Sequence, residues 1–127
     1  MNVFIADDSD ILRQRLKRFI MRVPDIEICG EAAGISEAIS LIHRLNPDII
    51  ILDIQFSDGL GFEIYDRVVT DSYRPFTLIL TNYPTGRYRK MCRDRKIECF
   101  FDKTTDFEKI YQVLSSLTSE ARKTQKH

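Results

Sequence analysis

The sequence lacks both an excess of charge of one sign and any long hydrophobic run. It holds 19 Lys and Arg against 19 Asp and Glu, so its formal net charge is zero and no overall field draws it toward nucleic acid or a membrane surface. No apolar stretch approaches the length that a membrane-spanning helix needs. Composition therefore predicts a globular protein for which neither direct nucleic acid binding nor membrane binding is expected.

Cysteine is scarce as well. The three cysteines, Cys29, Cys92 and Cys99, are an odd number and have no metal-ligand spacing. They favour reduced thiols in a cytoplasmic protein over a disulfide or a metal site. The N-terminus goes from Met1 directly into strand-like sequence with no basic leader, and this also predicts a cytoplasmic location.

No linker, repeat or low-complexity segment interrupts the 127 residues, which are 43% hydrophobic and 30% charged. This length and composition predict a single domain with a substantial core. We expect that domain to cover residues 1–118, followed by a polar, frayed tail over residues 119–127 and by no further domain.

The chain is organised around the apolar run Ile49–Leu52. A short run without alternation is typical of a strand buried on both faces of a parallel sheet. Asp53 stands at the carboxyl end of this run, which is where ligands of open α/β sheets gather. The polar, glycine-containing segment 55–61 that follows predicts a loop.

Strand-like and helical patterns alternate five times along the chain. The expected strands are residues 3–6, 26–32, 48–54, 76–81 and 97–101, and the expected helices are about residues 10–23, 35–45, 62–69, 87–95 and 107–117. Crossovers of this length make the strands parallel and place helices on both faces of the sheet. The predicted fold is a doubly wound α/β domain with a five-stranded parallel sheet.

Polar residues stand at four of the strand ends. Asp7 and Asp8 follow the first strand, and Asp53 ends the third. Thr81 closes the fourth strand, and Lys103 follows the fifth. Because the carboxyl ends of parallel strands share one edge of the sheet, these five side chains can converge.

Such a cluster predicts a metal and a phosphoryl group. Three neighbouring carboxylates cannot all stay ionised without a cation, and hard oxygen ligands suit Mg²⁺. The lysine and the hydroxyl could bind two further phosphate oxygens. Asp53 is then the carboxylate placed to receive the phosphoryl group.

The same residues make the chain resemble the receiver domain of response regulators in two-component signal transduction, of the single-domain, chemotaxis-regulator-like type. The resemblance rests on the pair Asp7-Asp8, Asp53 in Leu-Asp-Ile, Gly61 eight residues later, Thr81 closing a strand, and Lys103 after Phe-Phe-Asp. It covers the chain up to about residue 118. It implies a flavodoxin-like fold with strand order 2-1-3-4-5 and a receiver domain without an output domain in this chain.

The resemblance also implies residue roles. Asp53 would be the phosphoacceptor of a phosphorelay and would form an aspartyl phosphate, and Lys103 would bind a phosphoryl oxygen. The ligands of Mg²⁺ or Mn²⁺ would be Asp7, Asp8, Asp53 and the backbone carbonyl of Gln55.

The implied output is a conformational switch. Thr81 would move toward the phosphate, and Phe100 would turn and report phosphorylation to the face made by the fourth helix, fifth strand and fifth helix. The partners would be a histidine kinase or phosphotransfer protein and a downstream effector, and the protein would be a monomer or a phosphorylation-dependent dimer. It would be a signalling switch and no enzyme, beyond self-catalysed phosphorylation and dephosphorylation of Asp53.

The sequence departs from the family at several positions. Ser57 and Thr104 stand where prolines are common, the latter in a cis bond. A cis bond before a residue other than proline costs about 2.5–4 kcal/mol, which favours trans before Thr104, but the sequence does not decide between cis and trans there. Asn82 is larger than the residue often found there and would restrict access to the phosphate. Gln55 and Tyr83 occupy positions that tune dephosphorylation, so an altered phosphate lifetime is expected.

Other interpretations of single residues remain open. Asp7 alone would more often cap a helix, Thr81 would be a turn residue, and Lys103 would be a solvated charge. Phe100 is most often plain core at such a strand position. The functional interpretation of these residues is supported by their combination with Asp53 and with one another.

A basic cluster lies in the fourth predicted helix and just after it: Arg87, Arg89, Lys90, Arg93, Arg95 and Lys96. The default interpretation is a solvated helix face. Arg89, Arg93 and Lys96 share one side, so an acidic partner is a second hypothesis. Nucleic acid is disfavoured, since Tyr88 is the single interleaved aromatic residue.

The sequence leaves two alternatives to a phosphorylated receiver domain. Asp8-Ser9-Asp10 is similar to the Asp-x-Asp motif of haloacid-dehalogenase-like phosphatases, in which Asp8 would be the nucleophile and Asp10 the acid. Asp10 is also explained by the dipole of the first helix. The other alternative is a receiver-like module that binds partners without accepting phosphate.

Overall fold

The structure, a computed structural model, describes residues 1–125, with side chains as far as Ala121. Its elements in chain order are β1 (Asn2–Ala6), α1 (Asp10–Ile20), β2 (Glu27–Ala32), α2 (Ile35–Leu45), β3 (Ile49–Asp53), β4 (Gln55–Phe56), β5 (Gly59–Leu60), α3 (Phe62–Val68), β6 (Phe76–Thr81), α4 (Gly86–Asp94), β7 (Cys99–Asp102) and α5 (Phe107–Gln125).

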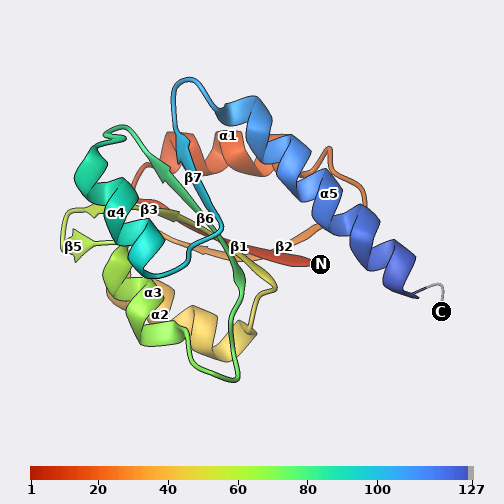
Figure 1. Cartoon of the computed structure of the whole chain (residues 1–127), viewed down its shortest axis with the longest axis horizontal. Coiled ribbons are helices and arrows are strands. Elements are labelled where there is room, and N and C mark those ends of the chain that lie inside the picture. The colour runs from red at the N-terminus through yellow and green to blue at the C-terminus, as the bar shows by residue number, and fades with distance from the viewer. Residues whose placement is uncertain (126–127) are drawn as a thin grey trace.

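The main sheet has the strand order β2-β1-β3-β6-β7, and each neighbouring pair is parallel. When only these five strands are counted, the order is 2-1-3-4-5, which confirms the predicted doubly wound, flavodoxin-like fold. Helices α1 and α5 cover one face of the sheet, and α2, α3 and α4 cover the other (Figure 1). The carboxyl ends of the strands therefore meet at one edge.

The alternation of side chains along the strands divides the core into two clusters. One contains Phe4, Ile50 and Ile79 with the buried sides of α2, α3 and α4. The other contains Ile5 and Ile51 with the buried sides of α1 and α5. Every residue of β3 is buried, as expected for the central strand of a sheet covered on both faces.

The helix starts follow local capping chemistry. The Ser9 hydroxyl accepts a hydrogen bond from the backbone N–H of Leu12 and thus caps α1. Thr85 caps α4 in the same way through the N–H of Tyr88. These caps fix where each helix leaves the carboxyl edge of the sheet.

The prediction of a loop over residues 55–61 was wrong. Gln55–Phe56 and Gly59–Leu60 pair as a small antiparallel two-stranded sheet, with Gln55 opposite Leu60. A hairpin closes here because the chain turns at Ser57 and Asp58, and Gly59 directly after them has a φ of +148°, a conformation that L side chains rarely adopt. The segment after β3 is therefore ordered by backbone hydrogen bonding.

The predicted frayed tail over residues 119–127 is helical for most of its length. Helix α5 continues to Gln125, and the last two residues of the predicted tail lie outside the described part of the chain. Nothing in the sequence stops the helix, since residues 107–125 contain neither Gly nor Pro. Among the described residues, no helix has the length and apolar character required to cross a membrane.

Candidate functional site at the carboxyl edge of the sheet

The end of β1 brings Asp7 and Asp8 to this edge. The backbone N–H of Asp7 donates to the carbonyl of Ala32 on β2, which extends the β1–β2 pairing by one residue (3.1 Å). Its Oδ1 accepts from the N–H of Ser9 at 2.8 Å. Asp7 is buried and Asp8 is exposed, so the two carboxylates differ in their access to water.

Asp53 reaches the same edge from the last position of β3. It is buried, and its Oδ1 accepts from the backbone N–H of Gln55 at 3.3 Å. The backbone around it is closely packed, because the N–H of Gly61 donates to the carbonyl of Ile54 at 2.6 Å. A Cβ at Gly61 would lie 1.9 Å from the carbonyl oxygen of Asp53, so this position has room only for glycine.

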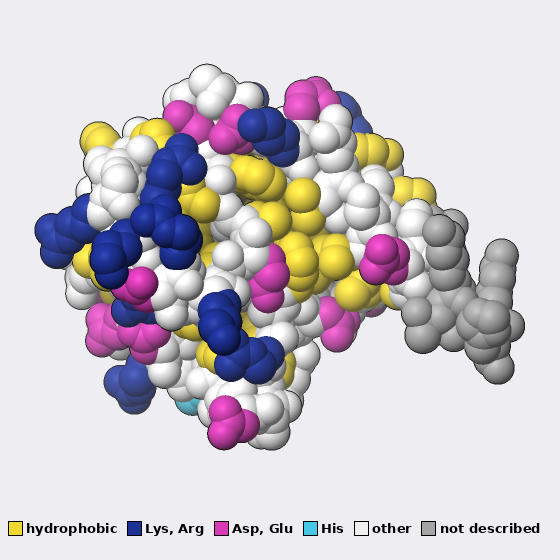
Figure 2. All heavy atoms as spheres, viewed as in Figure 1, with side chains coloured by type: hydrophobic (Ala, Val, Ile, Leu, Met, Phe, Trp, Pro, Cys, Tyr) yellow, Lys and Arg dark blue, Asp and Glu magenta, His cyan; other side chains and the backbone are white. Residues whose placement is uncertain are grey.

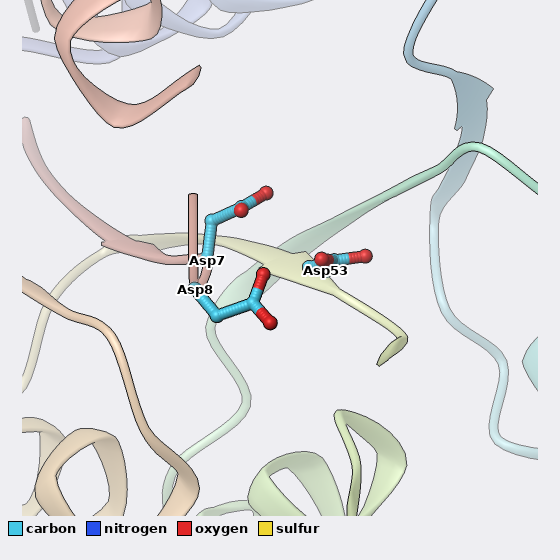
Figure 3. A group of neighbouring side chains, drawn as sticks. All are labelled: Asp7, Asp8 and Asp53. Atoms are coloured by element: carbon cyan, nitrogen blue, oxygen red, sulfur yellow. The ribbon is translucent and has the colours of Figure 1, made fainter. Parts of the chain in front are cut away.

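The carboxylates of Asp7, Asp8 and Asp53 converge as the sequence predicts. One oxygen from each lies within 4.8 Å of the others. Figure 3 shows Asp7 and Asp8 projecting from the chain that follows β1, and Asp53 from the end of β3. Three carboxylates, one of them open to solvent, fit a hard divalent cation such as Mg²⁺ that keeps part of its water shell.

Lys103 is the cation that the chain itself supplies. Its Nζ lies 2.7 Å from Oδ2 of Asp7 and 3.0 Å from Oδ2 of Asp53, and the side chain is nearly buried. The turn after β7 places it there, because the backbone N–H of Lys103 donates to the carbonyl of Thr81 at 3.0 Å. One lysine thus bridges the carboxylates that end two different strands.

This arrangement leaves an excess of negative charge, and the titration of Asp53 reflects it. Burial and the charge of Asp7 raise the pKa of Asp53 to about 6, although Lys103 acts in the opposite direction. Burial by itself lowers the pKa of Lys103. The hydrogen bond to Asp7 and the charges of Asp53 and Asp7 outweigh it, and the pKa of Lys103 is raised. Lys103 is therefore a permanent ammonium at neutral pH.

Thr81 closes the site from the end of β6. It is fully buried, and its hydroxyl accepts from the backbone N–H of Tyr83 at 3.0 Å. Beside it opens a cleft of about 350 Å³ that is lined by Asp8, Ser9, Asp53, Gln55, Phe56, Ser57, Asn82, Tyr83 and Lys103. The cleft is wide enough for a phosphoryl group and several waters.

The peptide between Lys103 and Thr104 is trans, and no described peptide bond is cis. An Asx turn takes the place of a proline. The N–H and the hydroxyl of Thr104 both donate to Oδ1 of Asp102, at 2.8 and 2.7 Å. The hydrogen bond from Thr104 also lowers the pKa of Asp102, so the carboxylate stays ionised and holds the turn.

Two contacts join the site to α4, and sequence analysis did not identify either pairing. The Gln55 side-chain amide donates to the Tyr88 hydroxyl at 3.3 Å. The guanidinium of Arg89 lies over the ring of Phe100, 4.6 Å from its centroid. Phe100 is half-buried and packs against the core that lies under α2, α3 and α4.

Arg13 is a further residue that sequence analysis did not assign to the site. Its guanidinium donates to the backbone carbonyl of Asp7 and to the carboxylates of Glu31 and Asp10. Its position one turn into α1 was the available signal, because an arginine there can reach back over the helix start. Arg13 holds the backbone that carries Asp7.

Asp10 lies apart from the carboxylate cluster. It is exposed in the first turn of α1, and its Oδ1 pairs with Arg13 at 3.0 Å. Asp10 is not among the residues that converge with Asp8. This placement gives no support to an Asp8-x-Asp10 phosphatase pair.

Comparison with known proteins decides the family. Residues 3–115 match the family described as Response regulator receiver domain. The chain belongs to this family. Receiver domains are the signalling switches of two-component systems, and they bind Mg²⁺ at an acidic pocket such as the aspartate cluster found in this chain.

Relatives of this receiver domain are longer proteins. The transcriptional regulatory protein BtsR of Escherichia coli is 29% identical over 123 residues, which are 97% of this chain and 50% of BtsR. The sensory transduction protein LytT of Bacillus anthracis is 32% identical over 114 residues, which are 90% of this chain and 46% of LytT. The chain thus spans about half the length of these relatives or less.

Solved structures confirm the fold of the receiver domain. The response regulatory domain of protein mrkE from Klebsiella pneumoniae has a TM-score of 0.84 at 20% identity and covers 97% of this chain and 99% of its own. A DNA-binding response regulator of the LuxR family from Staphylococcus aureus has a TM-score of 0.82 at 23% identity, with 91% and 96% covered.

Proposed function

We propose that this receiver domain is a phosphorylation-activated switch in which Asp53 accepts a phosphoryl group from a histidine kinase or a phosphotransfer protein. The observation that carries the proposal is the position of Asp53. It ends the central strand, lies within reach of two further carboxylates and contacts the buried Lys103. No other carboxylate of this cluster combines a strand end, a bound lysine and a place on the wall of the cleft.

The reaction follows from these contacts. An oxygen of Asp53 attacks the phosphorus of a phosphohistidine, a P–O bond forms, and the P–N bond breaks. The electron pair goes to the imidazole nitrogen, which takes up a proton. The Nζ of Lys103 lies 3.0 Å from Oδ2 of Asp53. Lys103 can therefore bind the oxygens of a phosphoryl group on Asp53 and stabilise their negative charge. Hydrolysis of the aspartyl phosphate by water releases inorganic phosphate and restores the carboxylate. In this proposal the domain catalyses both steps on its own Asp53.

The divalent cation would be Mg²⁺ or Mn²⁺, held by Asp7, Asp8, Asp53 and the backbone carbonyl of Gln55. When bound, it supplies positive charge that neutralises the carboxylates and the incoming phosphoryl group. Asp8 is exposed and lines the cleft, so the proposed metal site is open to the cleft on the side of Asp8. Arg13 keeps Asp7 in place through the backbone.

The signal leaves the site through Thr81 and Phe100. The Thr81 hydroxyl now accepts from the N–H of Tyr83, and a phosphoryl group on Asp53 offers it a stronger acceptor to donate to. Movement of Thr81 frees space toward which Phe100 turns. Phe100 lies on β7 beneath Arg89 of α4, so its rotation changes the face formed by α4, β7 and α5.

This face would bind a downstream effector or a second copy of the chain, with the protein a monomer or a phosphorylation-dependent dimer. We place the domain in the cytoplasm, where histidine kinases carry their phosphohistidine. Direct contact of this domain with nucleic acid is not part of the proposal. The relatives named as transcriptional regulators are about twice as long as this chain.

The test is to incubate the protein with Mg²⁺ and acetyl phosphate, measure intact mass and map the modified residue. A labile phosphoryl adduct on Asp53 that requires metal and is absent from Asp53→Asn supports the proposal. An adduct on Asp8 would revive the phosphatase alternative. No adduct with acetyl phosphate or a phosphoramidate would favour a module that acts without phosphate.

A further inference from the structure

The surface of α4 concentrates positive charge on a chain whose net charge is zero. Residues 86–96 contain six basic residues and a single acidic residue, Asp94. Figure 2 shows Lys and Arg side chains gathered over α4, with hydrophobic side chains exposed between them and α5. Positive charge is therefore concentrated on α4 and the two residues that follow it.

Half of these basic residues are used within the molecule. Arg95 makes a two-fold contact with Asp66, at 2.8 Å for each nitrogen, and lies over Phe62. Lys90 pairs with Asp94 at 2.8 Å, and Arg89 lies over Phe100.

The remaining three have no such partner. Arg87, Arg93 and Lys96 are exposed, and none of them forms an ion pair with a carboxylate of the described residues. They are thus available to a partner that brings negative charge.

An apolar groove lies on the other side of the edge strand β7. It has a volume of about 340 Å³, and its apolar lining is Phe76, Cys99, Val113 and Leu117. Cys99 follows Lys96 by only three residues, so Lys96 lies just before the strand whose first residue lines the groove. Glu120 lines the groove on α5, at the side away from α4.

We propose that Arg87, Arg93 and Lys96, together with this groove, bind an acidic protein segment that carries apolar side chains. Its carboxylates pair with the three basic residues, and its apolar residues enter the groove. This inference rests on the proposed function, because it assigns a partner chemistry to the face that Phe100 is proposed to control.

Protein fits this surface better than nucleic acid does. Nucleic acid affinity depends on many phosphate contacts, whereas only three basic residues here are unpaired. Nucleic-acid interfaces are more polar and more positive than protein interfaces. An apolar groove beside arginines is the combination found at the centre of protein–protein contacts.

The experiment uses a fluorescein-labelled amphipathic peptide of Glu and Leu, the same peptide with Gln in place of Glu, and a DNA duplex. Binding is measured by fluorescence anisotropy at low and high salt for the wild type and for Arg87→Glu/Arg93→Glu/Lys96→Glu. The matched control is Arg22→Glu/Arg44→Glu/Arg74→Glu, which makes the same charge change at exposed residues outside α4. Phosphorylation of every sample by acetyl phosphate is followed by intact mass.

The triple α4 variant is expected to bind the Glu-Leu peptide about tenfold more weakly than the wild type, with the control within about twofold. The Gln peptide should bind the wild type weakly, and added salt should reduce Glu-Leu binding. Equal binding by wild type and α4 variant, tighter binding of DNA than of peptide, or no peptide binding to the wild type would each overturn the inference. Normal phosphorylation of Asp53 in such a result would leave the proposed function standing, whereas absent phosphorylation would contradict the proposed function itself.

Discussion

The guanidinium of Arg89 lies over the ring of Phe100, 4.6 Å from the ring centroid. Arg89 belongs to α4 and Phe100 to β7, so one contact joins the two elements that border the proposed signalling face. A cation over an aromatic ring is stabilised by the negative potential of the ring face. In the proposed switch, Phe100 must leave this contact to turn toward Thr81, so Arg89 is expected to stabilise the unphosphorylated arrangement.

Arg89→Ala is therefore expected to favour the switched state. An exposed cation–π contact contributes about 0.5–1 kcal/mol, and its loss shifts a two-state equilibrium about two- to fivefold. The rate of phosphorylation by acetyl phosphate should rise by a similar factor. Arg87→Ala, on the same helix but without an aromatic partner, is the control. Equal rates for all three proteins would show that Arg89 does not restrain Phe100.

The hydrogen bond between Gln55 and Tyr88 should stabilise the segment that carries a proposed metal ligand. Tyr88→Phe removes only the hydroxyl, and Gln55→Ala removes the amide. Each variant is expected to bind Mg²⁺ about two- to twelvefold more weakly in calorimetric titration, since a net hydrogen bond contributes about 0.5–1.5 kcal/mol. The double variant should be no weaker than either single one. Additive losses would mean that the two residues act separately.

Gly61→Ala should severely destabilise the domain. The added Cβ would meet the carbonyl oxygen of Asp53 at 1.9 Å, and backbone atoms cannot give way as a flexible side chain does. We expect a loss of about 3 kcal/mol or more in urea unfolding. Gly86→Ala is the matched control, because nothing lies within 4 Å of its Cβ, and it should be neutral or slightly stabilising. Similar stabilities for the two variants would contradict this packing.

The raised pKa of Asp53 predicts a pH dependence of stability in metal-free buffer. Burial and the charge of Asp7 raise the pKa of Asp53 from its ordinary value to about 6, so the folded state binds the proton more tightly than the unfolded state does. The resulting loss of stability develops as pH rises from about 4 to about 6 and is complete above that.

Asp53→Asn should therefore stabilise the metal-free protein above pH 6, by about 2–3 kcal/mol, and give no gain near pH 4. Chemical denaturation across this pH range measures the difference, with Asp71→Asn in an exposed turn as the control. With Mg²⁺ added, the wild type should become more stable than Asp53→Asn, because the metal binds and stabilises the wild type alone. A stability gain that does not vary with pH would rule out Asp53 as the titrating group.

The sheet and the site residues were predictable because both depend on repeating or local patterns. Buried strands have unbroken apolar runs, and parallel strands place their carboxyl ends together whatever the loops do. Asp7, Asp53 and Lys103 could therefore be brought to one edge from the order of the strands alone.

Other features have no such pattern. Two-residue strands such as Gln55–Phe56 are too short to show periodicity, and their pairing depends on the turn at Ser57 and Asp58. The last turns of α5 lack an apolar stripe, so helical propensity alone extends the helix to Gln125. The contact between Arg89 and Phe100 joins two elements, and their relative position is set by the packed core.

The separation of the two cores by the sheet has a mechanical consequence. Phe100 packs with the core beneath α4, whereas α5 belongs to the core shared with α1. In the proposed switch, rotation of Phe100 would therefore be expected to displace α4, whereas α5 is expected to keep its position on the other core. A partner that binds across β7 would then contact α5, whose position stays the same, and α4, whose position changes with the switch. Substitutions in the α1–α5 core are then expected to change the stability of the fold and to leave the equilibrium of the proposed switch unchanged.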